Sequence, residues 1–235
     1  MEKDTAISTL NDYLTWVKEK RLVPVNLDIP GAFPLVDDLR KNLYFRGQSD
    51  ETWMITPALY RYRFNSENEW LKMAAMRTWQ ETYHLSNLNK LITFQHYGLK
   101  TRLLDVTRNP LVALYFACLS SQEKQETDGA VYYGHNDKDN SISAECLADI
   151  LFFFGYSQGD TYSMKEVKTK VSDRNVVAKE YLPDLREILC SPHFIKAPMN
   201  NPRISAQQGA FIMAPFLTER PGEKGKKCLL GSSPI

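Results

Sequence analysis

The amino-acid sequence predicts an α+β protein with helices before, between and around short strands. Apolar residues recur at helical spacing in several segments, and short apolar runs bounded by glycine or polar residues separate these segments. No internal repeat or low-complexity tract is present. The 235 residues, 43% of them hydrophobic, suit one large domain, or one domain with a small helical appendage.

The N-terminal segment predicts a helix over residues 4–20, because apolar residues follow a helical spacing at Ile7, Leu10, Leu14 and Val17. Either Thr5 or Ser8 is the expected cap. Residues 24–39 contain three prolines and a glycine, which indicates a turn-rich connection. We therefore expect the helix to be a lid or brace outside the central sheet.

The next elements lead to a buried helix. Residues 43–45 predict a short strand that ends in a loop at Arg46, and residues 67–95 give the longest helical pattern. A buried strand is expected over Thr101–Val106. Asn109 is the expected N-cap of the next helix, with Pro110 in its first turn. Residues 111–119 are apolar on nearly every side, which predicts a central, buried helix.

The second half of the chain predicts further short elements. Strands are expected at 130–133, 194–195 and 209–213, and helices at 143–155 and about 177–189, the latter disturbed by Pro183. Residues 134–142 predict a polar loop, residues 157–175 are polar and poorly patterned, and 221–235 form a short basic tail. The predicted organisation is therefore an N-terminal helix and connection (1–40), a domain (41–220) and the tail (221–235).

Composition excludes several classes of protein. The formal net charge of +1 argues against broad phosphate neutralisation, although a local basic groove is compatible with it. The four cysteines have no zinc-ligand spacing, so we expect thiols in a reducing cytosol and no metal. No signal peptide and no run of ~18 apolar residues is present. These features predict a cytoplasmic protein without membrane spans.

Familiar catalytic motifs are missing from the sequence. It contains no P-loop, GxGxxG after a strand, HExxH, GxSxG or EF-hand pattern. Cys118 lies inside the predicted apolar helix, a poor position for a nucleophile.

Polar residues gather in three segments, the first of which is residues 45–48. An arginine at a strand end, Arg46, suits a phosphate or carboxylate, and Gly47 allows a backbone or ligand to come close. The alternative is a structural ion pair at a sheet edge.

The second segment runs from Gln95 to Thr107 and places polar groups before the buried helix, whose N-terminus attracts anions. Its alternative is a capping network in which Asp105 pairs with Arg102 while Thr107 caps the turn. A lone histidine such as His96 is more often structural than a general base.

The third segment, residues 203–211, contains Gln207 and Gln208 before a glycine and an apolar strand. Their amides suit a sugar hydroxyl or a nucleobase edge, and equally suit solvent on an edge strand.

These segments, in this order, resemble the FRG-domain family, which is named for the Phe-Arg-Gly segment that here is Phe45-Arg46-Gly47. The resemblance covers roughly residues 40–215 and is most specific from Gln95 through Ala117. Such domains occur largely in bacteria and their viruses. The family usually continues with another helix and a closing segment, so we expect the C-terminal part here to be shortened or truncated.

A more distant resemblance, to ADP-ribosyltransferase folds, implies a short, mostly antiparallel split sheet with surrounding helices, and NAD as the substrate. The residues that it implies for NAD binding are Arg46, Gly47, Tyr97, Thr101, Arg102, Thr107 and Asn109. The candidate catalytic residues are Arg46, His96, Asp105, Gln207 and Gln208. The family pattern has Glu or Gln on the late strand, and a glutamine cannot act as a general base. Asp105 is the carboxylate that would replace it.

The resemblance therefore predicts an ADP-ribosyltransferase-like enzyme acting on nucleic acid or protein, a bacterial toxin or anti-phage effector. One alternative is a non-catalytic module that senses a nucleotide or a phage component. Another is a nucleic-acid-processing enzyme that uses His96 and Asp105, against which the modest net charge argues. The transferase hypothesis predicts that Arg46, Thr101 or Thr107, and Gln207 or Gln208 meet in one cleft.

Overall fold

The computed structural model describes residues 6–21, 43–61, 67–119, 127–135, 143–156, 161–162, 164–173, 184–196, 202–216 and 228–229. The chain forms two compact units. Unit 1 comprises Met1–Glu51 with Thr107–Lys138, and unit 2 comprises Thr52–Val106 with Asp139–Ile235. Each unit is described by itself below.

The described strands form an open five-stranded sheet in the order β3-β1-β2-β6-β5. Their bounds are β1 (Leu43–Gln48), β2 (Leu103–Thr107), β3 (Ala130–His135), β5 (His193–Lys196) and β6 (Gly209–Met213). The pairs β1–β2, β1–β3 and β5–β6 are antiparallel. A separate antiparallel ladder joins β4 (Thr161–Tyr162) to β7 (Cys228–Leu229). The predicted α+β class with an antiparallel sheet is confirmed.

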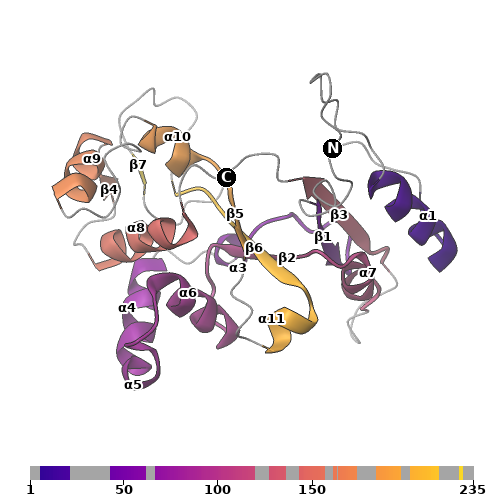
Figure 1. The fold of residues 1–235 in the computed structure, drawn as a ribbon, viewed down its shortest axis with the longest axis horizontal. Helices are drawn as coiled ribbons and strands as arrows, with labels where there is room; N and C mark the ends of the chain where they lie inside the picture. Colours follow the sequence, from indigo (N-terminus) through magenta and orange to yellow (C-terminus); the bar gives the residue numbers. More distant parts are fainter. Residues whose placement is uncertain are drawn as a thin grey trace, which may run out of the picture. The chain divides into compact units, whose positions relative to one another are not determined.

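Unit 1 packs helices α1 (Leu10–Arg21) and α7 (Pro110–Cys118) with β1 and β3, as Figure 1 shows. The buried members of its core are Tyr13, Val17, Leu43, Phe45 and Ala113. The first strand does not end at Phe45 as predicted, because β1 continues through Arg46 and Gly47 to Gln48 in unbroken register with β3.

Helix α1 is confirmed, but its predicted cap is wrong, and of its four predicted apolar positions only Val17 is buried. Thr9 is the cap, since its hydroxyl accepts a hydrogen bond from the Asp12 amide at 3.2 Å. Tyr13 is 3% exposed, whereas Leu10 is 58% and Leu14 44% exposed. The buried side of the helix is shifted from the expected one, because the aromatic residues Tyr13 and Trp16 pack against the unit 1 core. The helix therefore acts as a brace of unit 1.

Helix α7 begins as predicted, with the Asn109 side chain accepting from the Leu111 amide at 3.0 Å and Pro110 in the first turn. The expectation that the helix is central and buried is wrong. Only its Ala113 side packs on β1, while Leu111 and Tyr115 are exposed. Cys118 is exposed as well, at the helix end and not within a buried helix.

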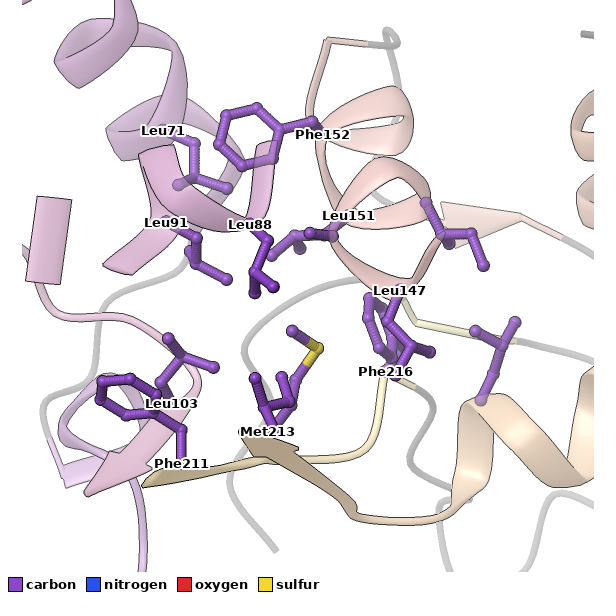
Figure 2. Close-up of a cluster of buried hydrophobic side chains, with 14 of the residues drawn as sticks. Leu71, Leu88, Leu91, Leu103, Leu147, Leu151, Phe152, Phe211, Met213 and Phe216 are labelled. Carbon is purple, nitrogen blue, oxygen red and sulfur yellow. The ribbon is translucent and has the colours of Figure 1, made fainter. Parts of the chain in front are cut away.

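Unit 2 has its core between helices and the strands β2, β5 and β6. The helices are α3 (Ala58–Arg61), α4 (Glu67–Arg77), α5 (Trp79–Thr82), α6 (Asn87–His96), α8 (Ala144–Tyr156), α9 (Met164–Asp173), α10 (Leu185–Cys190) and α11 (Pro202–Ala206). Figure 2 shows leucine side chains of α4, α6 and α8 in one buried cluster with Met213 and Phe211 of β6. This core holds the residues that precede β2 in place, and much of the second polar segment lies there.

Several predicted helices have different bounds. Residues 67–95 form three helices, α4, α5 and α6, because the chain turns near Thr78 and at Leu85–Ser86. The polar stretch 157–175 contains α9, whose buried Val167 and Val171 lie four residues apart. Helix α10 starts at Leu185, after Pro183, and α11 was not predicted. The predicted connection 24–39, most of the loop 134–142, the start of the helix at 177 and nearly all of the tail lie outside the described residues.

No helix in the described part of the chain is long and apolar enough to cross a membrane. Among the same residues, no group of three or more histidine, cysteine or acidic side chains is placed to hold a metal ion.

Candidate binding site on unit 1

The β1–β3 ladder has two chemically distinct faces. Side chains directly opposite each other in an antiparallel ladder lie on the same face, and alternate residues change face. One face carries Phe45 and Gly47 and is covered by α7. The other, called the polar face here, carries Tyr44, Arg46 and Gln48 of β1 opposite Gly134, Tyr132 and Ala130 of β3.

Arg46 is half-buried at the centre of the polar face. Its Nε donates to Oε1 of Gln48 at 3.1 Å, a bond between residues two apart on one side of the strand. Gln48 is itself buried, so its amide is held in place. A guanidinium oriented in this way presents a planar set of donors that suits a phosphate or carboxylate.

Tyr44 extends the polar face toward a second arginine. Burial raises the pKa of the Tyr44 hydroxyl, and the positive charge of Arg108 partly opposes that rise. The hydroxyl therefore stays protonated at neutral pH and can donate a hydrogen bond. Arg108 is exposed and follows β2 directly. The surroundings of Tyr44 thus include a cation that the sequence analysis did not select.

Gly47 has a packing role on the covered face. A Cβ atom at this position would lie 1.8 Å from the Ala113 carbonyl oxygen and 2.8 Å from the Ala117 nitrogen. The glycine therefore admits the backbone of α7, one of the two possibilities that the sequence left open. Its place on the strand sets Arg46 on the opposite, polar face.

Thr107 and Asn109 also belong to unit 1 and have capping roles. Thr107 is buried opposite Phe45, and its hydroxyl accepts from the Asn109 amide at 3.0 Å. The Asn109 side chain caps α7. This part of the proposed capping network is confirmed, and both side chains are occupied by the start of the helix.

Polar network in unit 2

The second polar segment forms a hydrogen-bonded network in unit 2. Gln95 of α6 donates through Nε2 to Oδ1 of Asp105 at 3.0 Å. The buried Thr101 hydroxyl donates to Oε1 of the same Gln95, and accepts from the Leu103 amide at 3.2 Å. Asp105 is exposed at the middle of β2 and is therefore the carboxylate of this network that solvent reaches.

Arg102 does not pair with Asp105, as the capping alternative had it, but with Glu67 of α4. Its Nε donates to Oε2 of Glu67 at 2.8 Å, its Nη2 donates to the same oxygen, and its Nη1 donates to the Pro215 carbonyl at 3.1 Å. The side chain also lies 4.5 Å from the centre of the Phe216 ring. Arg102 is 2% exposed. These contacts favour a structural role over contact with a nucleotide.

The electrostatics of Arg102 fit this role. Burial lowers the pKa of its guanidinium, but the nearby Glu67 carboxylate, Tyr60 and the hydrogen bond to Glu67 outweigh burial, so the pKa is raised overall. A charged pair is thus retained inside unit 2.

Tyr97 and His96 lie at the end of α6. Tyr97 is 65% exposed, and its hydroxyl donates to Glu81 at 3.2 Å. That hydrogen bond, followed by the charge of Glu81, raises the pKa of the phenol. His96 is half-buried in the last turn of α6.

Gln207 and Gln208 form the turn between α11 and β6. Gln208 is exposed and has a φ of 46°, the left-handed region that an amide-bearing residue tolerates better than most. Gln207 is half-buried. Both glutamines precede the strand and do not lie on it, so neither has the position of an edge-strand residue.

The predicted site residues thus fall into two sets, one in each unit. Arg46, Gly47, Thr107 and Asn109 lie in unit 1, whereas the predicted residues from His96 to Asp105 and the two glutamines lie in unit 2. Their convergence on one cleft stays a prediction.

The sequence analysis missed Tyr132 of the polar face and Arg108 near Tyr44. Arg108 directly follows the second segment, and its proximity to Tyr44 depends on the β1–β2 pairing. Tyr132 gave no local signal, because only the register of β3 places it opposite Arg46.

The FRG-domain family model matches residues 41–126 of the chain. Residues 41–126 therefore carry an FRG domain. The match contains β1, β2 and α7, and so both Arg46 and the second polar segment, and ends before the two glutamines. No curated protein and no solved structure matches the chain.

Proposed function

We propose that this FRG-domain protein is an ADP-ribosyltransferase-like enzyme that binds NAD through Arg46 and transfers ADP-ribose to nucleic acid or protein. In this proposal it acts as a bacterial toxin or anti-phage effector. The observation that carries the proposal is the half-buried guanidinium of Arg46, oriented by Gln48 on the polar face of the β1–β3 ladder.

Arg46 supplies the anion recognition that such an enzyme needs. NAD carries two phosphate groups, and an oriented guanidinium pairs with phosphate oxygens through parallel hydrogen bonds. The exposed Arg108 adds positive charge near the adjacent Tyr44. Because the rest of the chain is nearly neutral, binding would depend on these local charges and not on a broad basic surface.

The proposed reaction breaks the bond between ribose C1′ and the nicotinamide nitrogen, and nicotinamide leaves with the bonding electron pair. An oxygen or nitrogen atom of the acceptor then bonds to C1′ and gives up its proton. The resemblance to ADP-ribosyltransferase folds implies a carboxylate as the acceptor of this proton, and the sequence offers Asp105 for that role. Positioning contributes much of the rate, because the transition state resembles an oxocarbenium ion with little covalent assistance.

The second candidate is a non-catalytic module that senses a nucleotide or a phage component through the same arginine. The feature that favours it is the pair Gln207 and Gln208, which offer amides where a glutamate would serve transfer chemistry. In this case Arg46 would bind the nucleotide without turnover.

A test with NAD labelled in its adenylate part distinguishes the two candidate functions. The protein is incubated with NAD and with DNA, RNA or protein, and free nicotinamide and transferred label are measured. We expect both products from the wild-type chain, and a loss of at least ~100-fold in the Arg46→Ala variant, because a charged hydrogen-bonding anchor is removed. Arg46→Lys keeps the charge but loses the planar fork, so partial activity is expected.

Lys20→Ala is the matched control, since it removes a positive charge from α1, where the ammonium group lies over the Trp16 and Tyr133 rings. It should leave turnover unchanged. Tight NAD binding that depends on Arg46 without release of nicotinamide would support the sensor. Unaltered binding and turnover in Arg46→Ala would refute both roles for this residue.

A further inference from the structure

We propose that Tyr132 and Gly134 of β3 form the surface that binds the flat heterocycle of the ligand. The polar face would then bind a nucleotide more tightly than a simple phosphate. This inference rests on the proposed role of Arg46 as the anchor of the anionic group. It names the residues that determine which class of anion the site accepts.

The register of the ladder places Tyr132 beside Arg46. The two residues are direct partners in the antiparallel β1–β3 pairing, so their side chains leave the same face with Cβ atoms about 5 Å apart. The neighbouring Tyr133 pairs with Phe45 and points to the opposite face, where its ring meets Trp16 edge to face at 5.2 Å. One strand therefore carries two tyrosines with different surroundings.

Tyr132 is anchored at its far end. Its hydroxyl donates to the Glu51 carbonyl at 3.4 Å, a long hydrogen bond that restrains the ring. The ring is half-buried, so it is partly covered by the protein and partly accessible. An aromatic side chain in this state offers a π face to a nucleobase or a nicotinamide ring.

Gly134 leaves open space on the face of the ladder that carries Tyr132. A Cβ atom on Gly134 would meet no atom within 4 Å, whereas Cβ atoms on Gly47 and Gly129 would clash with the backbone of α7. Gly134 has no positive φ, so its backbone conformation does not require glycine. A glycine inside a strand weakens the strand and often marks the close approach of a ligand. The gap lies on the same face as Arg46 and Tyr132, because Gly134 pairs with Tyr44.

The chemistry of the three positions is complementary to a nucleotide. Arg46 takes the phosphate, the ring of Tyr132 stacks on the heterocycle, and the open surface above Gly134 accommodates the edge of that heterocycle. Pyrophosphate, which has no ring, uses only the arginine.

The test compares the affinities of NAD and of inorganic pyrophosphate by calorimetric titration of the full chain. We expect Tyr132→Ala to weaken NAD binding about 10- to 100-fold, the usual range for loss of a stacking partner, and to leave pyrophosphate within about two-fold. Tyr132→Phe should retain NAD affinity. Gly134→Val should weaken NAD selectively by filling the gap, and it should fold because its side chain enters open space.

Tyr133→Ala is the control on the same strand but the other face, and it should leave the affinities of both ligands unchanged. Thermal unfolding of every variant verifies that the strand is intact, and Tyr132→Ala tests the proposal even where Gly134→Val is unstable. The inference is overturned if NAD affinity survives Tyr132→Ala, or if pyrophosphate affinity falls with it equally. A different result would contradict the proposed function: the wild-type chain binds neither NAD nor pyrophosphate, or the Arg46→Ala variant binds both with normal affinity.

Discussion

Gly47 shows how one residue can serve packing on one side of a strand and fix a functional side chain on the other. The carbonyl oxygen of Ala113 occupies the space that a side chain at this position would need. We expect Gly47→Ala to lower the free energy of unfolding by ~2 kcal/mol or more, because a backbone shift of α7 or β1 is required to relieve the clash. Urea denaturation measures the change.

Gly134 is the matched control for this prediction, since it lies on the same ladder with open space around its Cβ position. Replacement of a strand glycine by alanine in open space should change the free energy of unfolding by less than about 1 kcal/mol, and a small gain is expected. Equal destabilisation by the two variants would contradict the packing role of Gly47.

At the level of elements, α1 contributes to the core of unit 1 through the side that carries Tyr13 and Val17. The Tyr13 hydroxyl also donates to the Pro110 carbonyl at 2.7 Å, which ties α1 to the start of α7. Tyr13→Ala should cost ~3–5 kcal/mol in the free energy of unfolding of unit 1, because a buried aromatic ring and its hydrogen bond are lost together. Chemical denaturation followed by circular dichroism measures this loss.

Leu14→Ala, one position further along the same helix, provides the comparison. Leu14 is largely exposed, so its truncation should change the free energy of unfolding by no more than ~0.5 kcal/mol. A larger loss from Leu14→Ala than from Tyr13→Ala would show that the helix packs through the face that the sequence spacing predicted.

At the level of the whole molecule, the buried Arg102–Glu67 pair holds three distant segments of unit 2 together: α4, the start of β2, and the chain after β6. Glu67→Gln leaves the Arg102 charge buried without its counter-charge. We expect a loss of ~3–5 kcal/mol in the free energy of unfolding of unit 2. Thermal and urea unfolding measure it.

Glu69→Gln, on the exposed side of the same helix, should cost less than ~1 kcal/mol. If Glu67→Gln were equally mild while Arg102→Met unfolded the protein, the arginine would be stabilising through the contacts of its guanidinium with the Pro215 carbonyl and the Phe216 ring, and not through the charge pair.

The order and type of many elements followed from local sequence. The cap at Asn109, the first-turn Pro110 and the strands near 103–107, 130–135 and 209–213 depend on short-range backbone preferences, which neighbouring residues suffice to specify. The polar segments likewise stood out by residue type alone. The FRG-domain match and the prominence of Arg46 were therefore accessible without a structure.

Tertiary contacts decided the partners of those residues. Arg102 pairs with Glu67, thirty-five positions away, and not with the nearby Asp105, because α4 packs beside the start of β2 and buries both groups. The spacing of leucines in α1 likewise gave the wrong face, since the aromatic rings made the larger contact. Tyr132 entered the candidate site only through the register of β3 against β1. The sequence by itself determined where most of the candidate polar and charged side chains lie along the chain, because side-chain type is local. Only the tertiary structure decided which of them meet, because strand register and helix packing are set by contacts between residues far apart in the chain.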